Sequence, residues 1–382
     1  MELTVFPALN GDCILIEYES SRYILVDGGY VDTYQNYLRP MLKQIAEQGG
    51  ELDMIIVTHI DSDHISGIIK LMEEEELSVP INGILYNGFR HVQSDVQFSG
   101  DKECFAHKNI CKVGSVLKDK QVSAKQGCTL SALIKRRGIP WNTHVDGRTV
   151  ISPGCLTLGD AVINILSPDS DGIDNLSKYW RKRLIKDGLL HEERSEEFWD
   201  DAFEFSLSIE KPVFHFNEKK VCKTYDLVKI CEEPYIPDTS ATNGSSISFI
   251  LEIKGKRLLF LGDAYSETVL NSLFSLYGSE NIPYAFDVVK LSHHGCFNNN
   301  SPDLLRMISS DKWIISTNGY KYSHPDLQTL AHIITKGNDC GNKLYFNYRL
   351  PIAEELMDDS YHENYEFDVI FPEEDKPLIV GI

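Results

Sequence analysis

The stretch Thr58-His59-Ile60-Asp61-Ser62-Asp63-His64 places two imidazoles and two carboxylates within six positions of each other. It follows the apolar run Met54-Ile55-Ile56-Val57, which is typical of a buried strand. Polar side chains at the end of such a strand are held firmly on one side and stay within reach of solvent. The pattern therefore predicts a metal site at a strand end.

The spacing within this cluster favours two cations over one, because neighbouring side chains on a tight loop point in different directions. We expect His59 and Asp61 to serve one ion, and Asp63 and His64 to serve the other. Neutral imidazole and carboxylate ligands suit zinc, although a shell this rich in carboxylate also accepts manganese or iron. The sequence thus predicts two divalent ions, with Zn²⁺ favoured and Mn²⁺ as the alternative.

Further motifs follow the cluster along the chain or precede it in a set order. They are Gly11–Ile16, Ile24–Gly29, Asn243–Ser246, Leu259–Ala264, Leu291–Gly295 and Tyr322–Pro325. With His59-x-Asp61-x-Asp63-His64, this order resembles the metallo-β-lactamase superfamily, in the variant where aspartate replaces the second histidine. Within that superfamily it is similar to ComEC-like DNA-uptake hydrolases and phosphorylcholine esterases. The recognisable sequence covers roughly residues 1–88, 150–168 and 243–335.

The resemblance implies metal ligands that lie far along the chain. Asp263 is expected to bridge the two ions, and His324 is expected to complete the ion held by Asp63 and His64. Asp27 ends a strand before two glycines, where it is expected to hydrogen-bond the metal loop rather than to touch metal.

The pair His293-His294 is expected to supply the other ion. We favour His294 as the ligand and His293 as a contact to the substrate or leaving group, although the two roles are open to exchange. The histidine that many superfamily members place before the bridging aspartate has no counterpart, and Asn243 stands near its place. Asn243, Ser245 and Lys290 are weaker candidates for substrate contacts, because turn formation or a solvated strand position explains them equally well.

The composition bounds the class of protein. The chain has 382 residues, 42% of them hydrophobic, which is enough for a substantial core. Nine cysteines without a C-x-x-C pair argue against a disulfide scaffold and favour a reducing compartment. No segment approaches the roughly 20 apolar residues of a membrane span, and the start lacks a signal-peptide pattern. We expect a soluble, cytoplasmic protein with no membrane partner.

The net charge of −20 follows from 57 acidic and 37 basic side chains, and a field of this sign repels a polyanion. The charge is uneven, because residues 89–150 hold 11 Lys and Arg against 5 Asp and Glu. Such runs are more often solvated faces than nucleic-acid surfaces. The overall charge therefore does not exclude a nucleic-acid substrate, and it does not indicate a protein partner.

Short apolar segments and helical patterns alternate in both halves of the chain. Strands are expected at 3–6, 13–18, 23–26, 54–57, 81–86, 247–253, 257–261, 288–291 and 313–316, and helices at 34–48, 65–76, 130–137, 266–277 and 327–335. From the resemblance we expect an α/β fold, a four-layer αβ/βα sandwich with the metals at one edge. A single domain would span 1–382, with a basic insertion at 89–150, a second insertion at 169–242 and an acidic C-terminal extension at 336–382.

Two ions bridged by Asp263 would lower the pKa of a shared water and yield hydroxide near neutral pH. This chemistry suits a phosphodiester, because attack builds negative charge on oxygens that two dications stabilise. His293 would protonate or stabilise the leaving alkoxide, so Asp63 and His293 are the expected catalytic residues. The leading hypothesis is a dinuclear phosphodiesterase that acts on nucleic acid or a nucleotide.

Two other functions stay open. One is the hydrolysis of a small ester, such as a choline phosphoester or a lactone, in a pocket narrowed by the two insertions. The other is a regulatory or binding subunit whose metals are structural. The intact ligand set argues against this last reading, since a degenerate site usually loses ligands.

Overall fold

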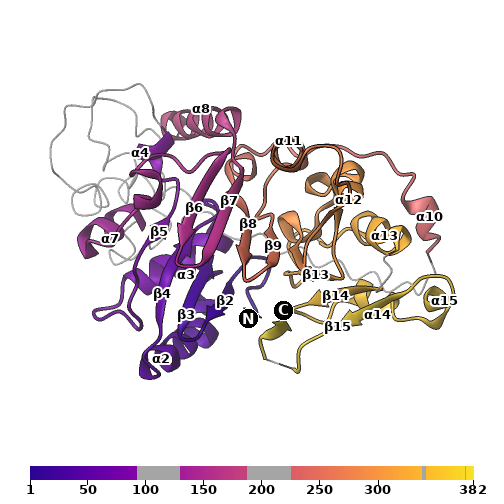
Figure 1. Cartoon of the computed structure of the whole chain (residues 1–382), viewed down its shortest axis with the longest axis horizontal. Coiled ribbons are helices and arrows are strands. Elements are labelled where there is room, and N and C mark those ends of the chain that lie inside the picture. Colours follow the sequence, from indigo (N-terminus) through magenta and orange to yellow (C-terminus); the bar gives the residue numbers. More distant parts are fainter. Residues whose placement is uncertain (93–129, 187–224, 338–340, 375) are drawn as a thin grey trace.

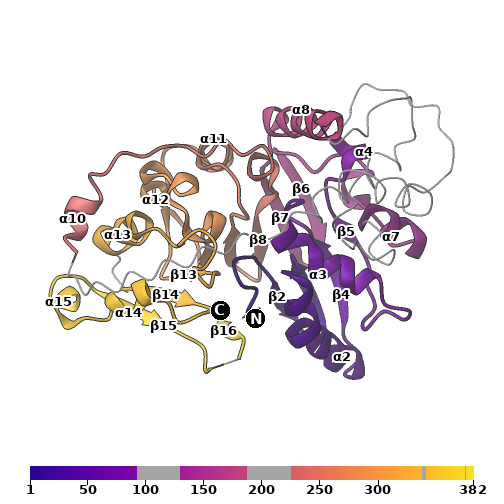
Figure 2. The same cartoon turned by 180° about the vertical axis from the view of Figure 1, so that it is seen from behind.

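The structure, a computed structural model, describes residues 1–92, 130–186, 225–337, 341–374 and 376–382. Two β-sheets lie face to face, and helices cover the outer side of each sheet (Figures 1 and 2). The first half of the chain builds most of one sheet with its helices, and the second half builds most of the other. The predicted α/β sandwich of four layers is therefore confirmed.

The first sheet has six strands. In spatial order they are β16 (Leu378–Gly381), β1 (Glu2–Val5), β2 (Ile14–Glu19), β3 (Arg22–Val26), β4 (Glu51–Ile56) and β5 (Ile84–Leu85). Strands β3, β4 and β5 run parallel, whereas β16, β1, β2 and β3 pair antiparallel. Because β3 and β4 are parallel, their carboxyl ends lie at the same edge of the sheet.

The second sheet has eight strands. In spatial order they are β15 (Phe367–Ile370), β14 (Asn342–Phe346), β13 (Lys312–Ile315), β11 (Val288–Lys290), β9 (Lys256–Phe260), β8 (Ser248–Ile253), β7 (Ala161–Ser167) and β6 (Gly154–Leu158). The strands from β9 to β15 are parallel, and the hairpins β6–β7 and β8–β9 close the other side. A short parallel pair, β10 (Tyr284–Ala285) and β12 (Ile308–Ser309), stands apart.

Alternating side chains divide the core into layers, since successive residues of a strand point to opposite faces. In β3, Ile24 and Val26 face the layer between the sheets, while Leu25 faces the helices. In β8, Phe249 packs between the sheets and Ile250 packs against the helices of the second half. All of these side chains are buried, so each sheet is covered on both faces.

Helices pack on the two outer faces. On the first sheet lie α1 (Val31–Thr33), η1 (Tyr34–Leu38), α2 (Arg39–Glu47), α3 (Ser62–Met72), α7 (Leu130–Arg137) and α8 (Ser170–Lys186). On the second lie α10 (Leu227–Ile230), α11 (Ser266–Tyr277), α12 (Pro302–Met307), α13 (Leu327–Lys336), α14 (Pro351–Glu355) and α15 (Asp359–His362). The short helix α4 (Phe89–Val92) contacts α8. No helix among the described residues is long and apolar enough to cross a membrane.

Two segments expected at the periphery, 336–382 and 89–150, pack against the core more extensively than their composition indicates. Residues 336–382, expected as an acidic extension, supply β14 and β15 to one sheet and β16 to the other. In the basic segment 89–150, α7 packs on α3, and Arg137 Nε donates to Met72 O at 2.7 Å. Much of this segment, and of 169–242, lies outside the described residues.

Candidate metal centre

Polar side chains gather where parallel strands of both sheets end. Asp27 follows β3, and the stretch His59–His64 follows β4 and leads into α3. From the second sheet, Asp263 follows β9, and the pair His293-His294 follows β11 in a short 3₁₀ segment. The carboxyl ends of parallel strands are where α/β sheets place their ligands.

Glycines allow the loops of this edge to approach one another. A Cβ at Gly67, in α3, would lie 1.9 Å from the backbone oxygen of Gly28, and Gly28 N donates to His64 O at 2.8 Å. A Cβ at Gly11 would lie 1.9 Å from the backbone oxygen of Asp63. Since no larger residue fits these contacts, glycine lets the first turn of α3 dock on the β1–β2 and β3 loops.

The carboxylate of Asp263 lies at the centre of the cluster. Its Oδ2 atom lies 3.6 Å from His59 Nε2 and from His64 Nε2, and 3.9 Å from His293 Nε2 and from His294 Nε2. Two ligand atoms on one tetrahedral zinc ion lie about 3.4 Å apart, given metal–ligand bonds of about 2.0–2.2 Å. The spacing around Asp263 is thus close to that of ligands around shared cations.

Hydrogen bonds on the far side of the rings set the tautomers of His59 and His64. His64 Nδ1 lies 2.8 Å from Asp27 Oδ2, and this carboxylate only accepts. Thr58 Oγ1 donates to the same carboxylate at 2.7 Å, so it can only accept from His59 Nδ1, 3.0 Å away. Both rings therefore carry their proton on Nδ1 when neutral and direct a free Nε2 lone pair at Asp263.

Asp12 lies behind the His294 ring, but no hydrogen bond joins the two side chains. His294 Nδ1 lies 3.5 Å from Asp12 Oδ1, and the other oxygen of Asp12 pairs with the buried ammonium of Lys290. Burial alone would raise the pKa of Asp12, but Lys290 and His294 hold the pKa well below its usual range. Carboxylates behind ligating histidines orient the rings and raise their basicity.

Burial and neighbouring charges shift the pKa values of the clustered side chains in different directions. Burial lowers the pKa of His59 to about 4, and the neighbouring charge of His64 acts in the same direction. Burial also opposes charge on His64, but Asp263 and Asp27 raise its pKa well above the ordinary value. Burial would raise the pKa of Asp263, yet His64 and the other imidazoles hold the pKa far below its normal range.

The site passes a direct test of fit for metal. His59 Nε2, His64 Nε2, His294 Nε2 and Asp263 Oδ1 are buried and make no hydrogen bond within the protein. Buried polar atoms are normally satisfied, so such a group of orphaned acceptors requires a partner. Nitrogen lone pairs around a carboxylate are the donor set of Zn²⁺ and related dications.

The structure changes the predicted grouping of ligands. Asp63, His64 and His294 lie together, with their ligand atoms all within 4.8 Å. His324, expected in that group, instead lies within 4.8 Å of His293 and Cys296. The correction follows from the loop after β13, which carries the His324 ring to the His293 side of the cluster, with ring centroids 5.3 Å apart.

The expected substrate contacts are engaged inside the protein. Lys290 is 1% exposed and pairs with Asp12, so it supports the centre from behind rather than facing solvent. Asn243 Nδ2 donates to Asp238 Oδ2 at 2.7 Å, and Ser245 Oγ donates to Thr242 O at 2.6 Å. Asn243 and Ser245 therefore have the turn-forming roles that were the alternative, whereas the burial of Lys290 fits neither a substrate contact nor a solvated strand position.

Other contributors were not singled out by sequence reasoning. Asp12 was visible in the Gly11–Ile16 motif, just before the second strand, but its pairing with Lys290 depends on the fold. Asn10 Nδ2 donates to Asp63 Oδ2 and Tyr30 OH donates to Asn10 Oδ1, and neither side chain belongs to a recognisable spacing. Contacts of this kind, made to side chains around the candidate ligands, become evident only in the folded structure.

The loop that carries His324 also holds a lysine and an exposed aromatic ring, Lys321 and Tyr322. Lys321 is half-buried, and its Nζ lies 4.7 Å from the ring centroid of Tyr322, which is 53% exposed. The Tyr322 ring lies 5.8 Å from that of His324. Burial opposes the charge of Lys321, but the Asp63 carboxylate keeps its pKa above the ordinary value.

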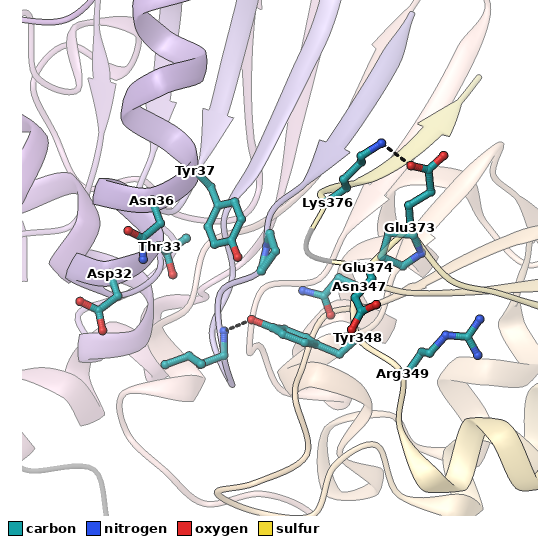
Figure 3. Close-up of a pocket in the computed structure, with 13 residues that line it drawn as sticks. Asp32, Thr33, Asn36, Tyr37, Asn347, Tyr348, Arg349, Glu373, Glu374 and Lys376 are labelled. Carbon is teal, nitrogen blue, oxygen red and sulfur yellow. Dashed lines mark hydrogen bonds and ion pairs between the residues drawn. The ribbon is translucent and has the colours of Figure 1, made fainter.

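A separate cavity of about 610 Å³ lies between the first helices and the C-terminal segment (Figure 3). Its wall includes Tyr37, Tyr348 and Arg349, and none of the candidate ligands lines it. Tyr348 accepts a hydrogen bond from Leu9 N at 2.9 Å, which anchors the turn that leads to Asn10. The cavity is thus behind the metal loop and separate from the centre.

Comparisons with known proteins agree with this class of site. Residues 7–92 match the model of the Metallo-beta-lactamase superfamily, so this segment is similar to that superfamily. The matched segment includes Asp27 and His59–His64. A search of the curated proteins finds no match.

Solved structures with similar arrangements include three from bacteria. The metallo-beta-lactamase fold protein YhfI from Bacillus subtilis is 10% identical, with 99% of this chain and 98% of that one covered and a TM-score of 0.37. Zn²⁺-bound PqqB from Methylobacterium extorquens is 10% identical, with 100% of each chain covered and a TM-score of 0.41. CmlA, a diiron beta-hydroxylase from Streptomyces venezuelae, is 9% identical, with 100% of this chain and 54% of that one covered and a TM-score of 0.40.

Proposed function

We propose that the protein is a phosphodiesterase that uses two divalent metal ions. The observation that supports this most is the convergence of four Nε2 atoms within 3.9 Å of Asp263 Oδ2. Carboxylates extend the donor set on both sides, with Asp61 Oδ2 3.7 Å from His59 Nε2 and Asp63 grouped with His64. Zinc as the physiological metal, the ComEC-like branch and a cytoplasmic location belong to the same proposal.

Two bound dications would activate water and neutralise charge that develops on the substrate oxygens. The protein's own contribution is to hold the ligands rigidly. Asp27 and Thr58 direct His59 and His64, and Asn10 holds one oxygen of Asp63, so little reorganisation is required on binding. Preorganised polar groups of this kind account for much of enzymatic rate enhancement.

Lys321 favours an anionic substrate over a neutral one. It stays protonated at neutral pH beside Asp63, and the exposed Tyr322 ring lies on the same loop. A positive charge at this place would attract the nonbridging oxygens of a phosphodiester, whereas a lactone offers no charge to bind. Nucleic acid or a nucleotide supplies both the anion and a base that can stack on tyrosine.

The test compares substrates on metal-loaded protein of measured metal content. Single-stranded DNA, RNA, a small chromogenic phosphodiester, a choline phosphoester and a lactone are assayed in parallel, with Asp263→Asn as the inactive control. We expect cleavage of the diester and of at least one nucleic acid, and no turnover by the variant. Turnover of the lactone alone would refute the phosphodiesterase proposal, and equal turnover by Asp263→Asn would refute the metal centre.

A further inference from the structure

The cavity of about 610 Å³ lies where the two halves of the molecule meet (Figure 3). One wall comes from the first helices, with Asp32 and Tyr37, and the other comes from the segments after β14 and β15, with Tyr348 and Glu374. Tyr37 packs against the core of the first half, and Tyr348 packs against that of the second. The volume lies within the range of about 300–1,000 Å³ that is typical of small-molecule sites.

The basic side chains of the cavity wall are engaged by other residues. Lys376 pairs with Glu373, and Figure 3 shows the two side chains directed at each other. Arg349 Nη1 lies 3.5 Å from Glu354 Oε1, and the guanidinium lies over the ring of Phe371, 4.7 Å from its centroid. Neither Glu354 nor Phe371 lines the cavity. The wall therefore offers little free positive charge to an anionic ligand.

Two carboxylates of the wall have no cationic partner. Asp32 and Glu374 are exposed, and no ion pair joins either of them to another side chain in the part of the chain that the structure describes. The two carboxylates belong to opposite walls (Figure 3). The net charge of −20 also raises the local concentration of cations around the protein. The charge of the cavity thus favours a ligand with more than one positive group.

The rings of Tyr37 and Tyr348 suit the same kind of ligand. Both are half-buried and reach into the space between the walls, where Pro7 and Pro372 add apolar surface (Figure 3). A cation over a tyrosine ring is attracted by the negative face of the ring. Methylene groups lose contact with water when they pack on such rings and on proline. Ammonium groups joined by a hydrocarbon chain match both properties.

Hydrogen bonds connect the cavity wall to the loop that supports the metal centre. Leu9 N donates to Tyr348 OH at 2.9 Å, and Leu9 has a left-handed backbone conformation, with φ of 59°. The next side chain along the chain, Asn10, donates from Nδ2 to Asp63 Oδ2. A conformation of this kind in a residue other than glycine persists only where the surroundings stabilise it. Tyr348 therefore contributes to the position of Asn10 and, through it, of Asp63.

We propose that this cavity binds a linear polyamine. One ammonium group pairs with Asp32 and another with Glu374, and the hydrocarbon chain between them lies along the two tyrosine rings. The bound polyamine stabilises the position of Tyr348 and the turn at Leu9, and it thereby tightens the binding of the ion at Asp63. By thermodynamic linkage, that ion tightens polyamine binding by the same factor. The binding site is independent of the proposed function, whereas the coupling rests on it for the presence of the ion.

Calorimetric titration of the full chain with spermidine tests the binding site. We expect one spermidine per chain in wild type and about 2–5-fold weaker binding in Asp32→Asn, Glu374→Gln and Tyr37→Leu, the range for exposed ion pairs and cation–π contacts. Glu232→Gln, which removes an exposed carboxylate outside the cavity, is the control and should bind as wild type does. Equal binding of several spermidines by all variants, or no binding by wild type, would overturn the proposal. Binding of inorganic phosphate that Arg349→Met abolishes would assign the cavity to an anion and overturn it as well.

Tyr348→Phe separates the coupling from the binding, because it keeps the ring and removes the acceptor of Leu9 N. Affinity for Co²⁺ is measured by competition with a chelator, with and without saturating spermidine. We expect spermidine to tighten Co²⁺ binding about fivefold in wild type, at the lower end of usual couplings, and to leave it unchanged in Tyr348→Phe. Unchanged affinity in wild type, or the same gain in the variant, would refute the coupling. Spermidine binding without hydrolysis of any phosphodiester would refute the proposed function and leave the polyamine site standing.

Discussion

The two halves of the molecule contribute to the centre in different ways. The first half supplies His59, Asp61, Asp63 and His64 from one loop and the first turn of α3. The second half supplies Asp263 and the pair His293-His294 from the ends of two different strands, β9 and β11. Local sequence therefore determines the first set, whereas strand order brings the second set together.

The difference extends to how the ligands are supported. Asp27 and Thr58, which orient the first-half histidines, lie at the neighbouring strand end and within the same loop. Behind His294 of the second half lies the Asp12 carboxylate from the first half, 3.5 Å away. The second-half ligands thus depend on the docking of the sheets, and the first-half ligands depend mainly on their own loop.

Replacing Asp263 is expected to have the largest effect, because its Oδ2 atom lies within 3.9 Å of the Nε2 atoms of four histidines. Asp263→Asn should lose both ions and lower hydrolysis by more than about 100-fold, since even residues behind a ligand cost 10–100-fold. Asp61→Asn should lose one ion and keep the one at Asp63, His64 and His294. Metal analysis after dialysis checks both variants, and two retained ions in Asp263→Asn would contradict the shared role.

Removing the Asp12 carboxylate, which pairs with Lys290 of the other half, is expected to lower the stability of the fold. Asp12→Asn leaves Lys290, which is 1% exposed, without its carboxylate. An uncompensated buried charge should lower the free energy of unfolding by about 3–5 kcal/mol. Urea unfolding measures this, and Asp12→Asn combined with Lys290→Met should recover much of the loss. If the double variant is no more stable than Asp12→Asn, charge pairing is not the cause.

Removing the contact between Asp27 and His64, which both belong to the first half, is expected to weaken metal binding. Asp27→Asn replaces the acceptor of His64 Nδ1, so affinity for the ion at His64 should fall about 10–100-fold. The matched control is Asp53→Asn, another buried aspartate, which hydrogen-bonds Tyr18 and Arg22 away from the centre. The control should lower stability and leave metal affinity unchanged; equal affinities in both variants would show that Asp27 does not position His64.

The smallest effect is expected at the loop that carries His324. Lys321→Met should raise KM for a phosphodiester about tenfold, because a charge-assisted contact is worth about 1.5–3 kcal/mol at most. The kcat and the turnover of any neutral ester should stay unchanged. Lys343→Met, a half-buried lysine on β14, is the control. A KM change for neutral substrates as well would show that Lys321 shapes the site rather than binding the anion.

Much of the fold and part of the centre were predictable from sequence. The expected strand at 54–57 corresponds to β4, and the expected helix at 266–277 to α11, because their apolar periodicities are strong. The segment 336–382, expected as an acidic extension, supplies the edge strands β15 and β16 and the inner strand β14. Edge strands carry few buried side chains, so their pattern is weak.

The positions of two side chains at the centre differ from those expected from motif order, for a common reason. His324 was grouped with Asp63 by motif order, whereas the loop after β13 places it beside Cys296. Lys290 was read as a solvated or substrate-facing residue, yet it is buried against Asp12, a residue far away in the chain. The order of the motifs identifies which residues are present, but it does not show in which direction their side chains point.

The amino-acid sequence by itself determined the layered α/β class and the first-half metal cluster, because these depend on periodicity and on ligands adjacent along one loop. Only the tertiary structure decided which histidine accompanies which carboxylate. Those pairings depend on ring tautomers and side-chain directions, which are set by hydrogen bonds such as His64 to Asp27 and His293 to Asn299. Contacts between residues distant in sequence exist only after the two sheets have packed together.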